Sequence, residues 1–273
     1  MNSIMLNNFI KFYIPLITSI FCMAANAENQ DVKLAYVGPD THTAYLGSLQ
    51  GLNEANLQGQ FLGKKYSLDL IPPDKALSRN YEGYMAIITA VDYDTFINLV
   101  NIVTDIPVFN TNLVQDSLRL DCRSNTFHII PGDKMLQDAV DQWHKKNPGS
   151  EVTARAWHHD FVKFAARDLN KRFLKEHDQP MDDYAWAGWA AVKMTSDAIV
   201  RGNITGADQL IDFLKNDLAF DGQKGIDMSF RTTGQLRQPI LIIENDKIVA
   251  EAPIRGVANP PTVESLGITG CPK

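Results

Sequence analysis

The sequence predicts an α/β protein with a parallel sheet in its first half and a smaller second half of helices and a β-hairpin. Two patterns lead to this class: short apolar runs alternate with helix-periodic segments up to about residue 146, and charged amphipathic segments dominate afterwards. The composition agrees, because 45% hydrophobic and 21% charged residues in a chain of 273 are ordinary globular values that exclude disorder and a coiled coil as the main state.

In the first half, each apolar run has the length of one buried strand and ends at a turn signal. The run at 32–37 ends at Gly38-Pro39, and the run at 66–71 ends at two prolines. The strand–helix–strand order predicts a parallel sheet wrapped by helices. Strands are expected at 32–37, 66–71, 84–90, 106–110 and 126–130, and helices at 43–58, 93–103 and 134–145, the last with Asp133 as its N-cap.

The second half has a different pattern. A helix opened by Pro180 has acidic residues in its first turn and ends at Arg201-Gly202, as helix-dipole preferences favour. Two alternating runs around Asn245-Asp246 predict a β-hairpin. The expected elements are a strand at 152–157, helices at 161–176, 180–202 and 207–215, and hairpin strands at 238–244 and 247–252, followed by an extended proline-containing tail.

The N-terminus has the pattern of a secretory signal peptide. An uncharged apolar stretch at 12–25 follows Lys11 and ends in the A-x-A motif Ala25-Asn26-Ala27. The alternative, a membrane anchor, is less favoured because a span needs about 18–20 apolar residues. We therefore expect residues 1–27 to be cleaved, the mature chain to start at Glu28, and the exported protein to have no membrane insertion.

Cysteine use agrees with export. Removal of the signal takes Cys22 and leaves two cysteines, Cys122 and Cys271. An even pair in an exported chain predicts one disulfide. The alternative is two free buried thiols, but Cys271 lies in a polar tail that offers no core to bury it.

Charge and motifs exclude several classes of function. With 26 Lys+Arg against 32 Asp+Glu, the formal charge of −6 argues against a nucleic-acid partner, which needs a basic face. The sequence has no GxGxxG, P-loop, G-x-S-x-G, CxxC or HExxH motif. We therefore expect neither an enzyme nor a bound cofactor.

Polar side chains gather where the predicted parallel strands end. Parallel strands end together at one edge of the sheet, where ligands of such sheets bind. The alternative, which stays open, is that these residues cap helices, with Thr41 or Thr43 as the cap, and satisfy loop amides. The candidate ligand-binding residues are Asp40, Thr41 and His42 after the first strand, Thr89 and Asp92 after the third, and Asn110 and Thr111 after the fourth.

Two further clusters carry potential chemistry. Trp157-His158-His159-Asp160 contains metal-ligating types, but neighbours on a strand point to opposite faces, so no metal site is expected and Asp160 is interpreted as a cap. The aromatic residues of the helix opened by Pro180 recur at helical spacing, which favours the core over a pocket: Tyr184, Trp186 and Trp189.

Several segments resemble a known family. The segment 51–63 (GLNEANLQGQFLG) resembles the first helix and turn of type I periplasmic binding proteins, the solute receptors of branched-chain amino acid ABC transporters. Others resemble the subfamily encoded with pyrroloquinoline-quinone (PQQ)-dependent alcohol dehydrogenase systems. These are 121–131, 135–142, 156–158, 169–173, 186–192, 224–225, and above all 229–231 with 235–239.

The resemblance implies two lobes with a ligand between them, and it places Trp157 and His158 as the contacts from the second lobe. This chain departs from the pattern, since the strand at 152–157 follows the helix ending near residue 146 almost at once. A strand–helix–strand unit needs about 30 residues, so the second lobe is expected to be reduced. The predicted domains are a complete first lobe at 28–146, a reduced second lobe at 147–252 and a tail at 253–273.

By resemblance, the expected function is that of a periplasmic solute-binding component of an ABC transport system linked to PQQ-dependent oxidation of methanol and other alcohols; related transporters are linked to lanthanide use. The expected partners are a small solute and a transporter permease or a PQQ-dependent dehydrogenase. The alternative is an accessory or assembly protein that contacts the dehydrogenase or its cytochrome, and the reduced second lobe favours this reading.

Overall fold

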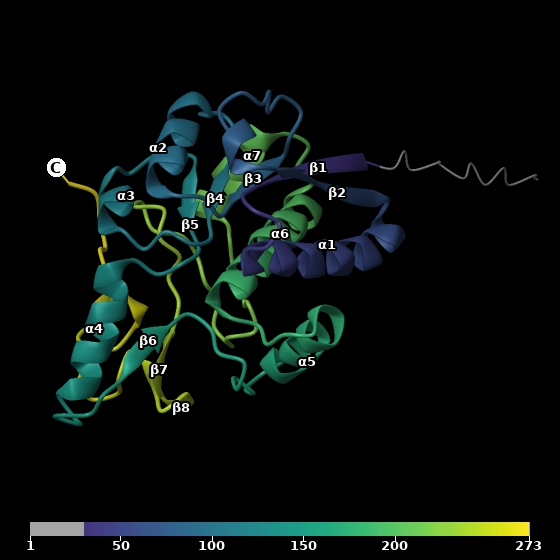
Figure 1. Ribbon diagram of the computed structural model, residues 1–273. Coiled ribbons are helices and arrows are strands. Elements are labelled where there is room, and N and C mark those ends of the chain that lie inside the picture. Colours follow the sequence, from purple (N-terminus) through teal and green to yellow (C-terminus); the bar gives the residue numbers. More distant parts are fainter. Residues whose placement is uncertain (1–29, 273) are drawn as a thin grey trace, which may run out of the picture.

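A five-stranded parallel sheet forms the centre of the computed structural model, which describes residues 30–272 (Figure 1). All of its neighbouring strands pair in parallel, in the order β2–β1–β3–β4–β5, as the alternating pattern predicts. The strands are β1 (Gln30–Val37), β2 (Lys64–Ile71), β3 (Ala86–Thr89), β4 (Val108–Asn110) and β5 (Thr126–His128).

The helices of the first half begin close to their expected positions, but their caps differ from the prediction. His42, instead of Thr41 or Thr43, caps the first helix, and Gly132 precedes the last, with Asp133 in its first turn. One short helix was not anticipated. The helices are α1 (Thr43–Leu62), α2 (Tyr93–Ile102), the unanticipated α3 (Asp116–Leu120) and α4 (Asp133–His144).

Strand alternation divides the core into two layers because successive side chains of a strand point to opposite faces of the sheet. The face packed against α1 and α6 buries Leu34, Tyr36, Ile88, Phe109 and Phe127. The face packed against α2 and α3 buries Ala35, Val37, Ile87 and Val108.

A second, three-stranded antiparallel sheet has the order β6–β7–β8. Its strands are β6 (Thr153–Arg155), β7 (Ile240–Glu244) and β8 (Lys247–Ala252). Asn245 and Asp246 form the β7–β8 turn with φ values of 49° and 58°, so the predicted hairpin is confirmed with two residue types that tolerate this backbone. Helix α4 lies against this sheet and shares a core with it through Met135 and Ala139 (Figure 1).

The three helices that follow β6 pack around α1: α6 lies along α1, α5 contacts α1 and α7 packs against α6. They are α5 (Ala166–His177), α6 (Asp183–Gly202) and α7 (Ala207–Asn216). Helix α6 lies along α1 so closely that a Cβ atom at Gly188 would be 2.0 Å from the Ala44 carbonyl oxygen (Figure 1).

Helix α5 begins later than its periodicity indicates, at Ala166 instead of residue 161. Phe164 interrupts the pattern with a φ of 54°, which a helix does not allow. The short 3₁₀ segments Pro73–Lys75 and Val263–Ser265 complete the elements.

The C-terminal tail is fastened to the first half of the chain. Cys122 and Cys271 are bonded, with their Cα atoms 6.0 Å apart, so the predicted disulfide is confirmed. The buried guanidinium of Arg231 attaches the tail also to the segment before β7, by donating hydrogen bonds to the carbonyls of Leu266 (2.7 Å) and Val263 (2.8 Å). None of the helices in residues 30–272 has the length and apolarity to cross a bilayer, and the predicted signal peptide lies outside the described residues.

Candidate functional site

Three of the expected ligand-binding residues are buried at the carboxyl edge of the first sheet, where their polar groups join the strand ends. Thr89 Oγ1 donates to the Phe109 carbonyl (2.8 Å), and Thr111 Oγ1 donates to the Thr89 carbonyl (2.7 Å). Asn110 Nδ2 donates to the Leu113 carbonyl (2.7 Å). These bonds give the three side chains a structural role at the edge, and their contact with a ligand stays a prediction.

Asp92, Asp40 and Thr41 lie at the surface of the same edge. Asp92 Oδ1 accepts a hydrogen bond from the Thr95 amide (2.9 Å), which caps α2 and lowers the pKa of the Asp92 carboxyl. Asp40 and Thr41 are exposed in the turn between β1 and α1. Their side chains are accessible to a solute at this edge.

His42 connects that turn to the start of α6. Its Nδ1 atom accepts a hydrogen bond from the Ala44 amide (3.2 Å), and its ring centroid lies 5.2 Å from that of Tyr184. Burial lowers the pKa of His42. Thr43 Oγ1 donates to the Asp182 carboxylate (2.9 Å), so the first turns of α1 and α6 lie side by side.

Trp157 lies in the core and not on the surface of a cleft. Its ring is fully buried and stacks on Trp186, with centroids 5.6 Å apart and planes 9° apart. Its Nε1 atom donates to Asn170 Oδ1 (2.8 Å). The Trp157 ring is fully used in core packing. It therefore has no free face for the contact with a ligand that the resemblance implies.

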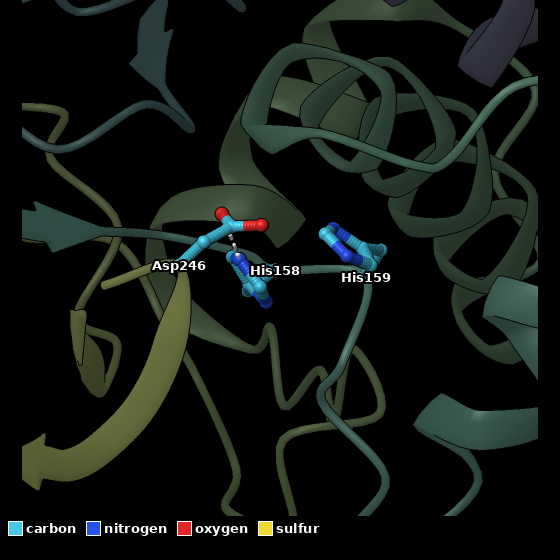
Figure 2. A group of neighbouring side chains, drawn as sticks. All are labelled: His158, His159 and Asp246. Carbon is cyan, nitrogen blue, oxygen red and sulfur yellow. Dashed lines mark hydrogen bonds and ion pairs between the residues drawn. The ribbon is translucent and has the colours of Figure 1, made fainter. Parts of the chain in front are cut away.

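His158 and His159 do not diverge as a strand would require. Strand β6 ends at Arg155, and the two histidines follow it in a turn where their rings stack with centroids 4.2 Å apart. His158 is buried, and its Nε2 atom lies 3.1 Å from Asp246 Oδ1 of the β7–β8 turn (Figure 2). The prediction that these neighbours point to opposite faces is therefore wrong.

A cavity of about 270 Å³ lies where the carboxyl edge of the first sheet meets the second sheet. Residues Val114, Ile130 and Pro131 come from that edge, and Asp183 and Tyr184 come from the start of α6. The remaining wall consists of Leu136 of α4 and residues 153–156 at β6. Apolar walls with a few polar groups are typical of small-molecule sites.

Asp183 supplies the acidic group of this cavity. Its Oδ1 atom accepts a hydrogen bond from the Trp157 amide (2.8 Å), and its Oδ2 atom lies 3.4 Å from Arg155 Nη1. The Asp183 side chain is only 17% exposed, whereas that of Arg155 is 49% exposed. Burial raises the pKa of Asp183 despite these two favourable contacts.

A buried amine lies behind the cavity. Lys224 Nζ is 4.2 Å from the centroid of the Trp186 ring and donates to Gln238 Oε1 (2.7 Å) and the Pro239 carbonyl (3.1 Å). Burial lowers the pKa of Lys224 to about 7, and the charge of Asp183 acts in the opposite direction. The ammonium form is thus stabilised by the same carboxylate that lines the cavity.

A larger cavity of about 590 Å³ lies at the opposite edge of the sheet, beside Tyr84, Met85 and Ile106. These residues precede β3 and β4, so this cavity is at the amino ends of the strands. Ligands of parallel sheets bind at the carboxyl ends. We therefore assign the candidate solute site to the smaller cavity.

Sequence reasoning missed three of the polar residues of that cavity as ligand contacts. Asp183 was explained by helix-dipole preference and Tyr184 by core packing, while Arg155 was not singled out. The signal for Asp183 was its place in an acidic pair at a helix start, Asp182-Asp183. Only the packing of α6 on α1 places that start at the edge of the sheet.

Comparison with known proteins identifies the fold. The sequence matches no family model and no curated protein. Among solved structures, a leucine-binding protein from Thermotoga maritima is similar, with a TM-score of 0.65 and 11% identity over 81% of this chain and 98% of that one. A periplasmic ligand-binding protein of a branched-chain amino acid ABC transporter from Burkholderia xenovorans has a TM-score of 0.69 and 12% identity over 86% and 96%.

A third similar structure is the substrate-binding protein of a branched-chain amino acid transporter from Streptococcus pneumoniae, solved with isoleucine. Its TM-score is 0.67, with 10% identity over 81% of this chain and 99% of that one. The class is therefore defined by architecture: this chain has the type I periplasmic binding protein fold, with one complete parallel-sheet lobe and a reduced second lobe. Identities this low show the fold alone.

Proposed function

We propose that this protein is the solute-binding component of an ABC transport system and that it binds a single amino acid or a similar small zwitterion. The observation that carries the proposal is the cavity between the two sheets, in which Asp183 and Arg155 lie beside apolar walls. The cavity lies between the two sheets, and the resemblance to type I receptors implies a ligand between the two lobes.

The polar groups of the cavity suit the two charges of an amino acid. The carboxylate of Asp183 is placed to accept hydrogen bonds from an ammonium group, and the Arg155 guanidinium is placed to donate to a carboxylate. A ligand would insert between these two side chains, whose 3.4 Å contact is long for an ion pair. Val114 and Ile130 then offer apolar surface to an aliphatic side chain.

The size of the cavity supports a small ligand. Sites for drug-sized molecules have volumes of about 300–1,000 Å³, and this cavity has about 270 Å³. The similar structures support this size of ligand, since they include a leucine-binding protein and a protein solved with isoleucine. Asp40, Thr41 and His42 stay candidate contacts from the first lobe, because their turn lies next to the start of α6.

The proposed setting is periplasmic and linked to PQQ-dependent alcohol oxidation. The A-x-A motif at 25–27 supports export, and the resemblance at 121–131 and 229–239 supports the link to the dehydrogenase systems. A transporter permease is the proposed partner.

The second candidate is an accessory protein that contacts the dehydrogenase or its cytochrome. The reduced second lobe favours it, because a sheet of three strands offers little structure to close over a solute. This role predicts co-purification with the dehydrogenase and no stabilisation by amino acids.

The test is isothermal titration of the mature protein with leucine, isoleucine and valine, and with methanol and PQQ as alternatives. We expect one amino acid to bind with one-to-one stoichiometry. Asp183→Asn should weaken that binding at least tenfold, because a hydrogen bond to a charged group contributes about 1.5–3 kcal/mol. Asp94→Asn, which removes an exposed carboxylate at the start of α2, is the matched control and should bind as the wild type does.

Two results would contradict the proposal. One is the absence of heat and of thermal stabilisation with every amino acid, since a bound ligand must raise the melting temperature. The other is unchanged affinity in Asp183→Asn, which would place the ligand elsewhere.

A further inference from the structure

Two histidines and an aspartate meet outside the solute cavity, from segments almost 90 residues apart in sequence. His158 and His159 belong to the turn after β6, and Asp246 belongs to the turn of the β7–β8 hairpin (Figure 2). One nitrogen of each histidine and one carboxylate oxygen lie within 4.8 Å of one another. We propose that His158, His159 and Asp246 bind a divalent transition-metal ion such as Zn²⁺.

The distances are close to those of a coordination sphere. His158 Nε2 and Asp246 Oδ1 are 3.1 Å apart, and two ligand atoms of a tetrahedral zinc ion are separated by about 3.3 Å when its bonds are about 2.0 Å long. The imidazole of His159 needs a small inward movement to complete the set. Its side chain is 41% exposed, so it has room to change rotamer.

The donor atoms select the class of metal. Imidazole nitrogen suits zinc, copper, nickel and iron, whereas calcium and magnesium prefer sites built from oxygen. Two imidazoles and one carboxylate therefore favour a transition metal. Three protein ligands leave a fourth coordination position for water. The carboxylate of Asp160, whose Oδ1 atom is 3.8 Å from His159 Nε2, offers another oxygen near that histidine.

The hydrogen bonds of His158 show what binding must change. Its Nδ1 atom accepts from the Asp160 amide at 3.2 Å, so the neutral ring carries its proton on Nε2, directed at Asp246. A metal ion takes the place of that proton, which moves to Nδ1, and the contact with the Asp160 amide is lost. Residues 159–160 form an exposed turn that can make this adjustment.

Packing holds one of the ligands, His158, in place before any metal arrives. The His158 side chain is 4% exposed, so packing restricts its ring. Asp246 sits at a left-handed turn position, which fixes where its side chain starts. A bound ion would tie the hairpin turn to the segment that begins at the solute cavity, where the Trp157 amide contacts Asp183.

The test is titration of tag-free, chelator-treated protein with ZnCl₂ by calorimetry, together with melting curves with and without Zn²⁺. We expect one equivalent of zinc to bind and to raise the melting temperature. His159→Ala and Asp246→Asn should each lower the zinc affinity at least tenfold. Both changes are in exposed side chains, and asparagine tolerates the left-handed turn at position 246.

His144→Ala is the matched control, because His144 lies on α4 and bonds to the Ser150 carbonyl outside this cluster. It should bind zinc as the wild type does. The inference is overturned if zinc binding is absent, or if it persists unchanged in His159→Ala and Asp246→Asn. Solute binding does not enter this experiment, so its outcome is independent of the proposed transport function.

Discussion

At the scale of single residues, burial of Asp183 has two consequences: it costs stability, and it supports the proposed role of this side chain in binding. The side chain accepts a hydrogen bond from the Trp157 amide and faces Arg155, but desolvation outweighs both and raises its pKa. A carboxylate that is poorly solvated in the free protein gains most from a charged ligand. This is the physical basis for assigning it to an ammonium group.

The raised pKa gives a prediction about stability and pH. The folded protein holds the Asp183 proton more tightly than the unfolded chain does, so this contribution to stability is fully present below about pH 4 and is lost as the pH rises through the pKa of the folded state. Asp183→Asn cannot ionise. Its free energy of unfolding relative to the wild type should therefore increase between pH 4 and pH 7, as measured by urea denaturation.

The control for this experiment is again Asp94→Asn, which replaces an exposed carboxylate outside the cavity and is measured in parallel. A constant difference between Asp183→Asn and the wild type over this pH range would contradict the burial argument. Loss of amino-acid binding without loss of stability would separate the role of this carboxylate in binding from any role in folding.

At the scale of elements, the contact between α1 and α6 determines where the proposed solute cavity lies. Small residues let the two backbones approach: a Cβ atom would lie 1.8 Å from the Ala185 carbonyl oxygen at Gly47, and 2.0 Å from the Ala44 carbonyl oxygen at Gly188. This approach places the start of α6, with Asp183, beside the turn that follows β1. A shift of α6 would therefore change the cavity as well as the core.

Gly188→Ala tests this contact. The added methyl group must push the helices apart, so we expect a loss of about 1–3 kcal/mol in the free energy of unfolding and weaker solute binding. Gly270→Ala is the control, because no atom lies within 4 Å of the position of its Cβ. Equal stability of the two variants in chemical denaturation would show that the interface adapts without cost.

At the scale of the whole molecule, segments from the second half of the chain attach to the first sheet and to its loops. The isolated bridge between His128 and Gln235 adds a segment beside β5, and the disulfide fastens the tail to the loop before it. The second sheet has three strands and shares its own small core with α4. The stability of the second half thus depends on attachments to the first.

The disulfide is the longest of these attachments, because its cysteines have a sequence separation of 149. Closing so long a loop stabilises the folded state by about 4–5 kcal/mol in the chain-entropy model. Replacing both Cys122 and Cys271 by serine should lower the free energy of unfolding by up to this amount. Guanidinium denaturation of the variant and of the oxidised and reduced wild type measures it, and equal stability of all three would refute the prediction.

Much of the architecture could be predicted because local physics determines it. Apolar runs bounded by Gly and Pro predicted all five parallel strands, and Asn245-Asp246 predicted the hairpin. These signals act within a few residues of the chain. The less accurate predictions depended on neighbours distant in sequence. The late start of α5 at Ala166 follows from the left-handed Phe164, whose ring lies over Gly225.

Some features of the candidate site were likewise predictable from the sequence, and others were not. Three features follow from the sequence alone: the sheet edge at which Thr89 and Asn110 lie, the pairing of Cys122 with Cys271, and the reduction of the second lobe. They follow because strand order, cysteine number and segment length are properties of the chain. The folded structure was needed to show that Asp183 and Arg155 line the cavity and that His158, His159 and Asp246 converge. The reason is physical: helix packing and turn geometry join segments whose separation along the chain contains no information about their distance in space.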